Sequence, residues 1–180
     1  MHLKNAFQVA QEIESDGIKL LLPLLNKFAF SGKLVHIGDG RRAEELQKVV
    51  GDFCLTGHDD KLYTVEVKVD TRDETGNLFL ETWSNKQRFT PGWMVTGNFD
   101  VLLYHFINID MVLSINFQKL KGWAFGTDGM KGRVYDFREV KQNRFDQKND
   151  THGRIVPITI IEKEVGIKIY DLKHESEIPF

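Results

Sequence analysis

The sequence predicts a mixed α+β (α/β) fold, in which a mixed β-sheet with a central antiparallel meander is flanked by helices. Two observations lead to this prediction. An N-terminal stretch repeats apolar residues at helical spacing, and the segments after it alternate apolar and polar residues or form short apolar runs, as strands do. No internal repeat or low-complexity segment divides the chain, so residues 1–180 are expected to form a single domain.

Helices are expected first along the chain. Residues 3–28 form the first helix, which Gly17 or Pro23 could bend or split. A short strand at residues 33–37 and a second helix at residues 41–50 follow. The apolar positions of the first helix recur at steps of three and four: Ala6, Ala10, Ile13, Gly17, Leu20 and Leu24.

Strands dominate the rest of the chain, apart from one helix and one polar segment. A helix is expected at residues 116–125, and residues 126–154 are polar and less regular. A C-terminal β-hairpin is expected over residues 155–170, around Glu162-Lys163-Glu164. The other expected strands span residues 52–56, 61–70, 77–83, 100–107 and 111–115.

The composition excludes several classes of protein. Cys54 is the single cysteine, so neither an internal disulfide nor a multi-cysteine zinc site can form, and a cytoplasmic protein is expected. No run of about 18 apolar residues occurs, so no membrane partner is expected. The formal net charge of -2 argues against a protein that coats nucleic acid nonspecifically.

The clearest strand, residues 61–70, has two different faces because side chains alternate along a strand. One face carries Tyr63, Val65, Val67 and Val69, and the other carries Leu62, Thr64, Glu66, Lys68 and Asp70. Glu66 and Lys68 therefore point the same way, about 7 Å apart along the strand. Burying such charges in a valine-rich strand is costly without a purpose, although a salt bridge on a solvated sheet face is the plainer explanation.

Asp52 adds a second carboxylate near Glu66 and Lys68. It stands at the start of the preceding expected strand, and a short turn at residues 57–60 connects the two strands. Two carboxylates from adjacent strands can hold a hard divalent cation such as Mg²⁺, which positions a scissile phosphate and lowers the pKa of bound water. A lysine two residues after the second carboxylate would orient that water or stabilise the developing negative charge.

Asp52 followed by Glu66-Val67-Lys68 resembles the Asp…(Asp/Glu)-x-Lys signature of the restriction-endonuclease-like, or PD-(D/E)xK, nuclease superfamily. The resemblance extends over roughly residues 6–125, with helices before strands. It implies a restriction-endonuclease-like core. Asp52, Glu66 and the backbone carbonyl of Val67 would bind metal, and Lys68 would assist the water. Gly51 departs from the family pattern, in which proline often stands at this position.

Members of that superfamily also often carry a catalytic glutamate on the first helix. Glu12, Glu14 and Asp16 all qualify, and helical phase does not choose among them. We place Glu14 first, and a plain solvated helix face is the alternative.

Glu81 is a further candidate that depends on strand register. If residues 61–70 and 77–83 pair as an antiparallel hairpin with the turn centred between residues 73 and 74, Glu81 faces Glu66. Glu81 would then be another metal ligand or a neighbour of one. A slip of one residue would move it to the opposite face.

A basic segment is the candidate for holding the phosphate backbone. Residues 119–154 contain nine Lys/Arg and five Asp/Glu, a local net charge of +4. Lys141, Arg144 and Lys148 are the nucleic-acid-binding candidates, and an ordinary surface loop is the alternative.

Three functions remain in competition at this stage. The first is a Mg²⁺-dependent phosphodiesterase, in which Mn²⁺ can substitute, acting on nucleic acid and expected to be a DNA endonuclease or structure-specific nuclease. The second is a non-catalytic interaction module that keeps the nuclease fold. The third is an unrelated α+β enzyme in which Glu66 and Lys68 form only a salt bridge. A homodimer is compatible with all three.

Overall fold

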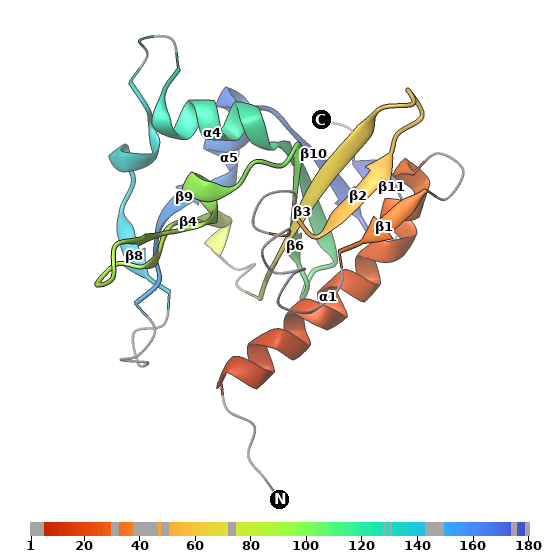
Figure 1. Ribbon diagram of the computed structural model, residues 1–180, viewed down its shortest axis with the longest axis horizontal. Coiled ribbons are helices and arrows are strands. Elements are labelled where there is room, and N and C mark those ends of the chain that lie inside the picture. Colours follow the sequence, from red (N-terminus) through yellow and green to blue (C-terminus); the bar gives the residue numbers. More distant parts are fainter. Residues whose placement is uncertain are drawn as a thin grey trace, which may run out of the picture.

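The computed structural model describes residues 6–29, 33–37, 47, 51–71, 75–127, 129, 131–142, 150–173 and 176–178. The fold is mixed α+β, as predicted, and a mixed sheet is flanked by helices (Figure 1). The helix expected at residues 41–50 lies outside the described residues, apart from Gln47, which is helical.

Within the described residues, the larger of two sheets has seven strands. Its centre is the parallel pair β3 (Leu62–Asp70) and β6 (Val101–Phe106), and all other neighbours in it are antiparallel. β3 is therefore buried between two neighbours, as its valine content predicts. In spatial order the strands are β1 (Leu34–His36), β2 (Phe53–Thr56), β3 (Leu62–Asp70), β6 (Val101–Phe106), β7 (Met111–Asn116), β10 (Ile167–Asp171) and β11 (Ser176–Ile178).

The smaller sheet has four antiparallel strands, and its existence corrects the expected meander. The strand after β3 does not fold back onto β3, because β6 occupies that edge. It joins a strand from near the C-terminus instead. Strands that follow each other along the chain are often, but not always, neighbours in a sheet. In spatial order the strands are β5 (Thr90–Pro91), β4 (Asn77–Asn85), β9 (His152–Pro157) and β8 (Glu139–Lys141).

The helices differ in length and in how their ends are formed. α1 (Ala6–Phe28) runs unbroken through Gly17 and Pro23, so neither of these two residues splits the helix. Asn116 caps α4 by accepting a hydrogen bond from the Lys119 amide at 2.9 Å. The described helices are α1 (Ala6–Phe28), α3 (Trp93–Thr96), α4 (Phe117–Phe125), α5 (Ile158–Glu164) and the 3-10 helix η3 (Val134–Asp136).

The expected C-terminal hairpin over residues 155–170 does not form. β9 ends at Pro157, the chain turns into α5, and β10 joins the seven-stranded sheet. The run of isoleucines that suggested a strand forms a helix instead, in which Ile161 is fully buried and Ile160 is half-buried. β-branched residues favour strands only weakly when the tertiary packing favours a helix.

Two hydrophobic cores hold these layers together. One lies between α1 and the seven-stranded sheet and includes Leu21, Leu25, Val65 and Val67. The other lies between the opposite face of that sheet, α4 and the four-stranded sheet. α1 thus lies on one side of the seven-stranded sheet, and α4, α5 and the four-stranded sheet lie on the other (Figure 1).

Candidate active site

The β2–β3 hairpin brings Asp52 to Glu66. The antiparallel register pairs Phe53 with Val65, so Asp52, the residue before β2, lies beside Glu66. The Val67 amide donates a hydrogen bond to Asp52 Oδ2 at 2.7 Å, which fixes the carboxylate against β3. The hairpin that the sequence predicted at residues 52–70 is confirmed.

Gly51 explains the departure from proline before Asp52. Its φ is +81°, in the left-handed region, and a Cβ placed there would lie 2.6 Å from the Val65 carbonyl oxygen. Proline cannot adopt this conformation, and the close approach of the chain to β3 requires glycine.

β3 has the two faces that its alternation predicts. Val65 and Val67 are buried in the core with α1, while Glu66 and Lys68 face the four-stranded sheet. α1 approaches β3 closely, because a Cβ at Gly17 would lie 2.6 Å from a methyl group of Val69. This packing brings Glu14 of α1 to the edge of the site.

Glu66 and Lys68 form a buried ion pair. Lys68 Nζ lies 2.5 Å from Glu66 Oε1, and the side chains are 28% and 10% exposed, respectively. Burial raises the pKa of Glu66 to about 7, although Lys68 opposes the rise. The nearby carboxylates of Asp52 and Glu14 raise it further. Burial is therefore the main reason for the raised pKa of Glu66, and Lys68 offsets the effect of the two neighbouring carboxylates.

Both carboxylates and an aromatic ring surround the Lys68 ammonium. Burial disfavours its charged form, but the carboxylates of Glu66, Asp52 and Glu14 outweigh this and raise the pKa of Lys68 above its ordinary value. Its Nζ also lies 5.8 Å from the centre of the Trp93 ring, within the range of a cation–π interaction. From the sequence, Trp93 is a candidate for stacking on bases or for core or interface packing, as are Trp83 and Trp123, and nothing local predicts its contact with Lys68.

Glu81 approaches Lys68 from the four-stranded sheet. Burial raises the pKa of Glu81, while Lys68 and a hydrogen bond from the Trp93 amide oppose the rise. Gly92 permits this arrangement, because a Cβ there would lie 2.7 Å from Glu81 Cγ. The predicted pairing of Glu81 with Glu66 is nevertheless wrong, since β4 pairs with β5 and β9 and not with β3. Glu81 reaches the site through the packing of two sheets.

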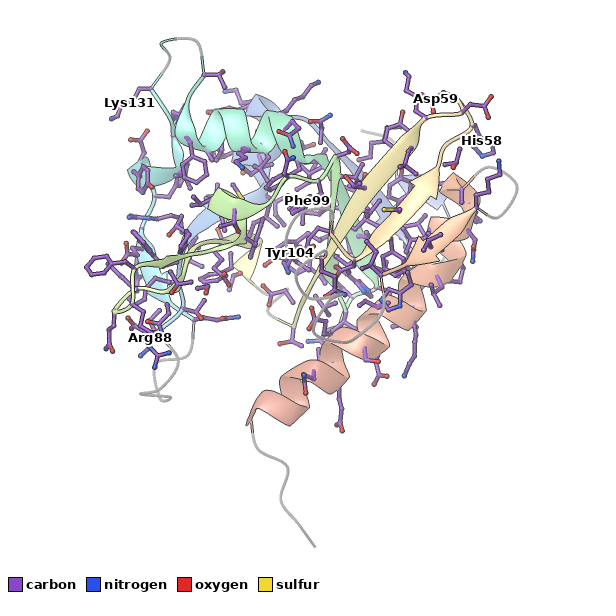
Figure 2. The ribbon with its side chains drawn as sticks, viewed as in Figure 1. His58, Asp59, Arg88, Phe99, Tyr104 and Lys131 are labelled. Carbon is purple, nitrogen blue, oxygen red and sulfur yellow. The ribbon has the colours of Figure 1, made fainter. Side chains whose placement is uncertain are left out.

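Tyr104 sets the spacing between the two sheets at this point. Its hydroxyl donates to Asp70 Oδ2 at 2.7 Å and accepts a hydrogen bond from the Phe79 amide at 3.2 Å. Figure 2 shows Tyr104 near the middle of the molecule, between β6 and the four-stranded sheet. This bridge joins β3, β6 and β4, and no local sequence pattern predicts it.

Of the acidic residues of α1, Glu14 is the one whose charge acts on Glu66 and Lys68. Asp16 pairs with Lys19 at 3.0 Å instead. Glu14 lines the cavity that also contains Lys68 and Glu81. We call Glu14, Asp52, Glu66, Lys68 and Glu81 the β3 cluster.

The β3 cluster has a donor set that suits Mg²⁺ only in part. Among the residues that the structure describes, no three or more His, Cys, Asp or Glu side chains converge as metal ligands, so Glu81 does not complete a ligand set with Asp52 and Glu66. Mg²⁺ commonly takes only one or two carboxylates and keeps several waters. The hydrogen bond uses Asp52 Oδ2 and the ion pair uses Glu66 Oε1, so the second oxygen of each carboxylate is the candidate metal ligand. Four carboxylates around one ammonium favour such a charge.

The predicted nucleic-acid-binding residues do not gather in the described structure. Arg144 and Lys148 lie outside the described residues. Lys141 is committed to an ion pair, 3.6 Å from Asp150 Oδ1. It belongs to a group of charged side chains at the end of the four-stranded sheet, which we call the β8–β9 network: Lys86, Glu139, Lys141, Asp150, His152 and Arg154.

Comparison with models of known families, with curated proteins and with solved structures gives no significant match for this chain. None of the helices described in the structure is both long and apolar enough to cross a membrane.

Proposed function

We propose that the protein is a metal-dependent nuclease that hydrolyses phosphodiester bonds, with DNA as the expected nucleic acid and Asp52, Glu66 and Lys68 at its active centre. One observation carries the proposal: a short hairpin brings Asp52 beside the buried Glu66 and Lys68, where several carboxylates share one ammonium. The restriction-endonuclease-like signature in the same residues supports it, and an endonuclease or structure-specific nuclease is the form proposed.

Asp52, Glu66 and the carbonyl of Val67 would hold the metal, with Mg²⁺ as the expected ion and Mn²⁺ as its substitute. When bound, the metal would supply charge neutralisation for the phosphate and activation of water. Asp52 is preorganised for this role because the Val67 amide fixes its carboxylate. Glu66 must lose its proton to become a ligand, so its raised pKa makes metal binding stronger as the pH rises through about 7.

Lys68 would stabilise the negative charge that develops on the phosphate. It is positioned for this by its ion pair with Glu66 and by the Trp93 ring. A fixed ammonium in a partly desolvated site is worth more than one in water. Glu14 and Glu81 act through their charge on Lys68, and we treat them as positioning residues.

A non-catalytic interaction module is the second candidate. The contact between Lys68 and Glu66 favours it, because two buried opposite charges already satisfy each other. On that account the pair is structural, and neither residue would change partners when nucleic acid or a metal is added.

The test is cleavage of a mixed set of single- and double-stranded DNA and RNA with and without Mg²⁺ or Mn²⁺. The nuclease proposal expects metal-dependent products from the wild-type protein and none from Asp52→Asn. Asp59→Asn is the matched control, because Asp59 lies at the β2–β3 turn, at the far end of the same hairpin (Figure 2). Products that Asp52→Asn makes at the wild-type rate would remove the nuclease assignment.

A further inference from the structure

A cavity of about 500 Å³ opens between the two sheets beside the β3 cluster. Its volume lies in the range of pockets that bind small ligands. β3, β4, β6, β9, α1 and α3 all contribute to its walls. Among the side chains that face it are Lys68, Phe79, Glu81, Trp93, Tyr104 and Ile155.

The described lining of the cavity carries one positive and three negative side chains. Lys68 is the one cation among its described lining residues, and it stands on the β3 wall next to Glu66. Glu14, Asp70 and Glu81 are the acids that line it. Among the described lining residues, Lys68 alone offers an anionic group an opposite charge, and it shares that charge with Glu66 and Glu81, whereas hydrogen-bond donors are favoured near the carboxylates.

The wall formed by the four-stranded sheet has an apolar part. Phe79 pairs with Ile155 across β4 and β9, so both side chains lie on the face that lines the cavity. The Phe79 ring rests on Gly153, where a Cβ would come within 2.6 Å of it. Phe79 is only half-buried, while Leu78 and Leu80 on the opposite face are fully buried in the core. An aromatic ring that faces a cavity instead of the core is suited to stack on a planar ligand.

We propose that this cavity binds one unpaired nucleotide of the substrate, with its base on Phe79, its exocyclic amine donating to Glu81 and its phosphate at Lys68. The inference rests on the proposed function and specifies the substrate class of the same site. A nucleotide has the required polarity, with an anionic phosphate at one end and a planar base with donors at the other. Cytosine and adenine carry an exocyclic amine, and thymine does not.

The proposal restricts the form of the nucleic acid. A base inside a duplex is stacked and paired, so it reaches such a pocket only after it has left the helix. Single strands, flaps and mismatched sites therefore bind better than a fully paired duplex. This preference separates the cavity from a surface that only contacts the phosphate backbone, which binds paired and unpaired strands through charge alone.

Binding is measured without metal, by fluorescence anisotropy of labelled oligo(dC), oligo(dT) and a paired duplex in the presence of a chelator. The expected order of affinity is oligo(dC), then oligo(dT), then the duplex. Phe79→Leu keeps an apolar side chain of similar volume but removes the ring, and it should weaken binding of both single strands about tenfold. Phe79→Tyr keeps the ring and should restore binding.

Two further variants locate the contacts. Glu81→Leu should remove the preference for oligo(dC) over oligo(dT), because the acceptor for the amine is removed. Phe89→Leu is the control, since Phe89 is 80% exposed and does not line the cavity. It should bind all three nucleic acids as the wild type does.

The outcomes for the cavity and for the nuclease are distinct. Phe79-dependent binding of single strands supports the inference even where no metal supports cleavage, and then only the proposed reaction fails. Metal-dependent cleavage together with equal binding of duplex and single strands, unaffected by Phe79→Leu, overturns the inference and leaves the nuclease proposal standing.

Discussion

The β3 cluster and the β8–β9 network are both groups of charged side chains at partly buried positions, but their charges are matched differently. In the β8–β9 network, Glu139 contacts Lys86, His152 and Arg154, and Asp150 contacts His152 and Lys141. In the β3 cluster, four carboxylates share one ammonium.

The pKa shifts of the carboxyl groups in the two groups have opposite signs. The hydrogen bond from Lys86 lowers the pKa of Glu139. Burial would raise the pKa of Asp150, but hydrogen bonds from His152 and the Gln87 amide lower it. In the β3 cluster, burial raises the pKa of Glu66 and of Glu81. The carboxyl groups of the β8–β9 network are thus each supplied with hydrogen bonds and cations, whereas those of the β3 cluster are buried with one shared lysine, a pattern that agrees with the proposed function.

Removing one lysine from each group should have very different effects on cleavage. Lys68→Met should lower the cleavage rate by a factor on the order of 10² to 10³, because one stabiliser of the transition state is removed. Lys141→Met should leave the rate within about threefold of the wild type. Single-turnover rates with Mg²⁺ measure both. Similar decreases in rate from the two variants would mean that the difference in charge between the β3 cluster and the β8–β9 network does not contribute to catalysis.

The contributions of the two groups to the free energy of unfolding should also change with pH in opposite directions. The pKa of Glu66 is about 7 in the folded protein and 4.5 as its ordinary value, so the folded state binds more protons between these values. Its contribution to stability is therefore lost as the pH rises through this window, by about 3 kcal/mol. Glu66→Gln should remove this slope. The measurement is the free energy of unfolding of the wild type and of Glu66→Gln at pH values from 4 to 8.

The lowered pKa of Glu139 predicts the reverse for the β8–β9 network. Its contribution to stability is present above its ordinary pKa and is lost as the pH falls through the lower folded value. At neutral pH, Glu139→Gln should destabilise the fold by about 1–2 kcal/mol, because the ion pairs with Lys86, His152 and Arg154 are partly solvated. Urea unfolding midpoints are the measurement, and a Glu139→Gln protein as stable as the wild type would show that the network does not stabilise the fold.

The smallest expected effect concerns the basic segment. Neutralising Arg144 and Lys148 together should make the salt dependence of DNA affinity shallower, by roughly one unit of slope for each phosphate that the protein no longer neutralises. Lys141→Gln should change it little, because Lys141 is paired with Asp150. An unchanged slope in the double variant would make residues 143–149 irrelevant to binding.

Local patterns predicted the parts of the site that short connections determine. The alternation along residues 62–70 predicts which side chains share a face, and the turn at residues 57–60 is too short for any pairing of β2 and β3 but a hairpin. Asp52, Glu66 and Lys68 follow from these two constraints. Glu14 follows in part, since helical phase left three candidates and only the packing of α1 on β3 selects among them.

Long-range pairing determines what the sequence did not predict. The choice of β9 as the partner of β4 depends on matching apolar side chains more than 70 residues apart, such as Leu78 and Val156. That choice creates the second sheet, the cavity and the positions of Glu81 and Trp93. Glu81 lies near Lys68 even though the predicted pairing was wrong, because two sheets facing each other can bring side chains as close as two paired strands do.

Binding of Mn²⁺ to the protein without nucleic acid tests the central claim most directly. Electron paramagnetic resonance measures the concentration of free Mn²⁺ during a titration at pH 8, where the Glu66 carboxyl is mostly ionised. The account predicts a Mn²⁺ site in the wild type and in Asp59→Asn that is lost or greatly weakened in Asp52→Asn. Equal Mn²⁺ binding by all three proteins, or by none of them, would contradict the assignment of the β3 cluster as a metal-dependent active site.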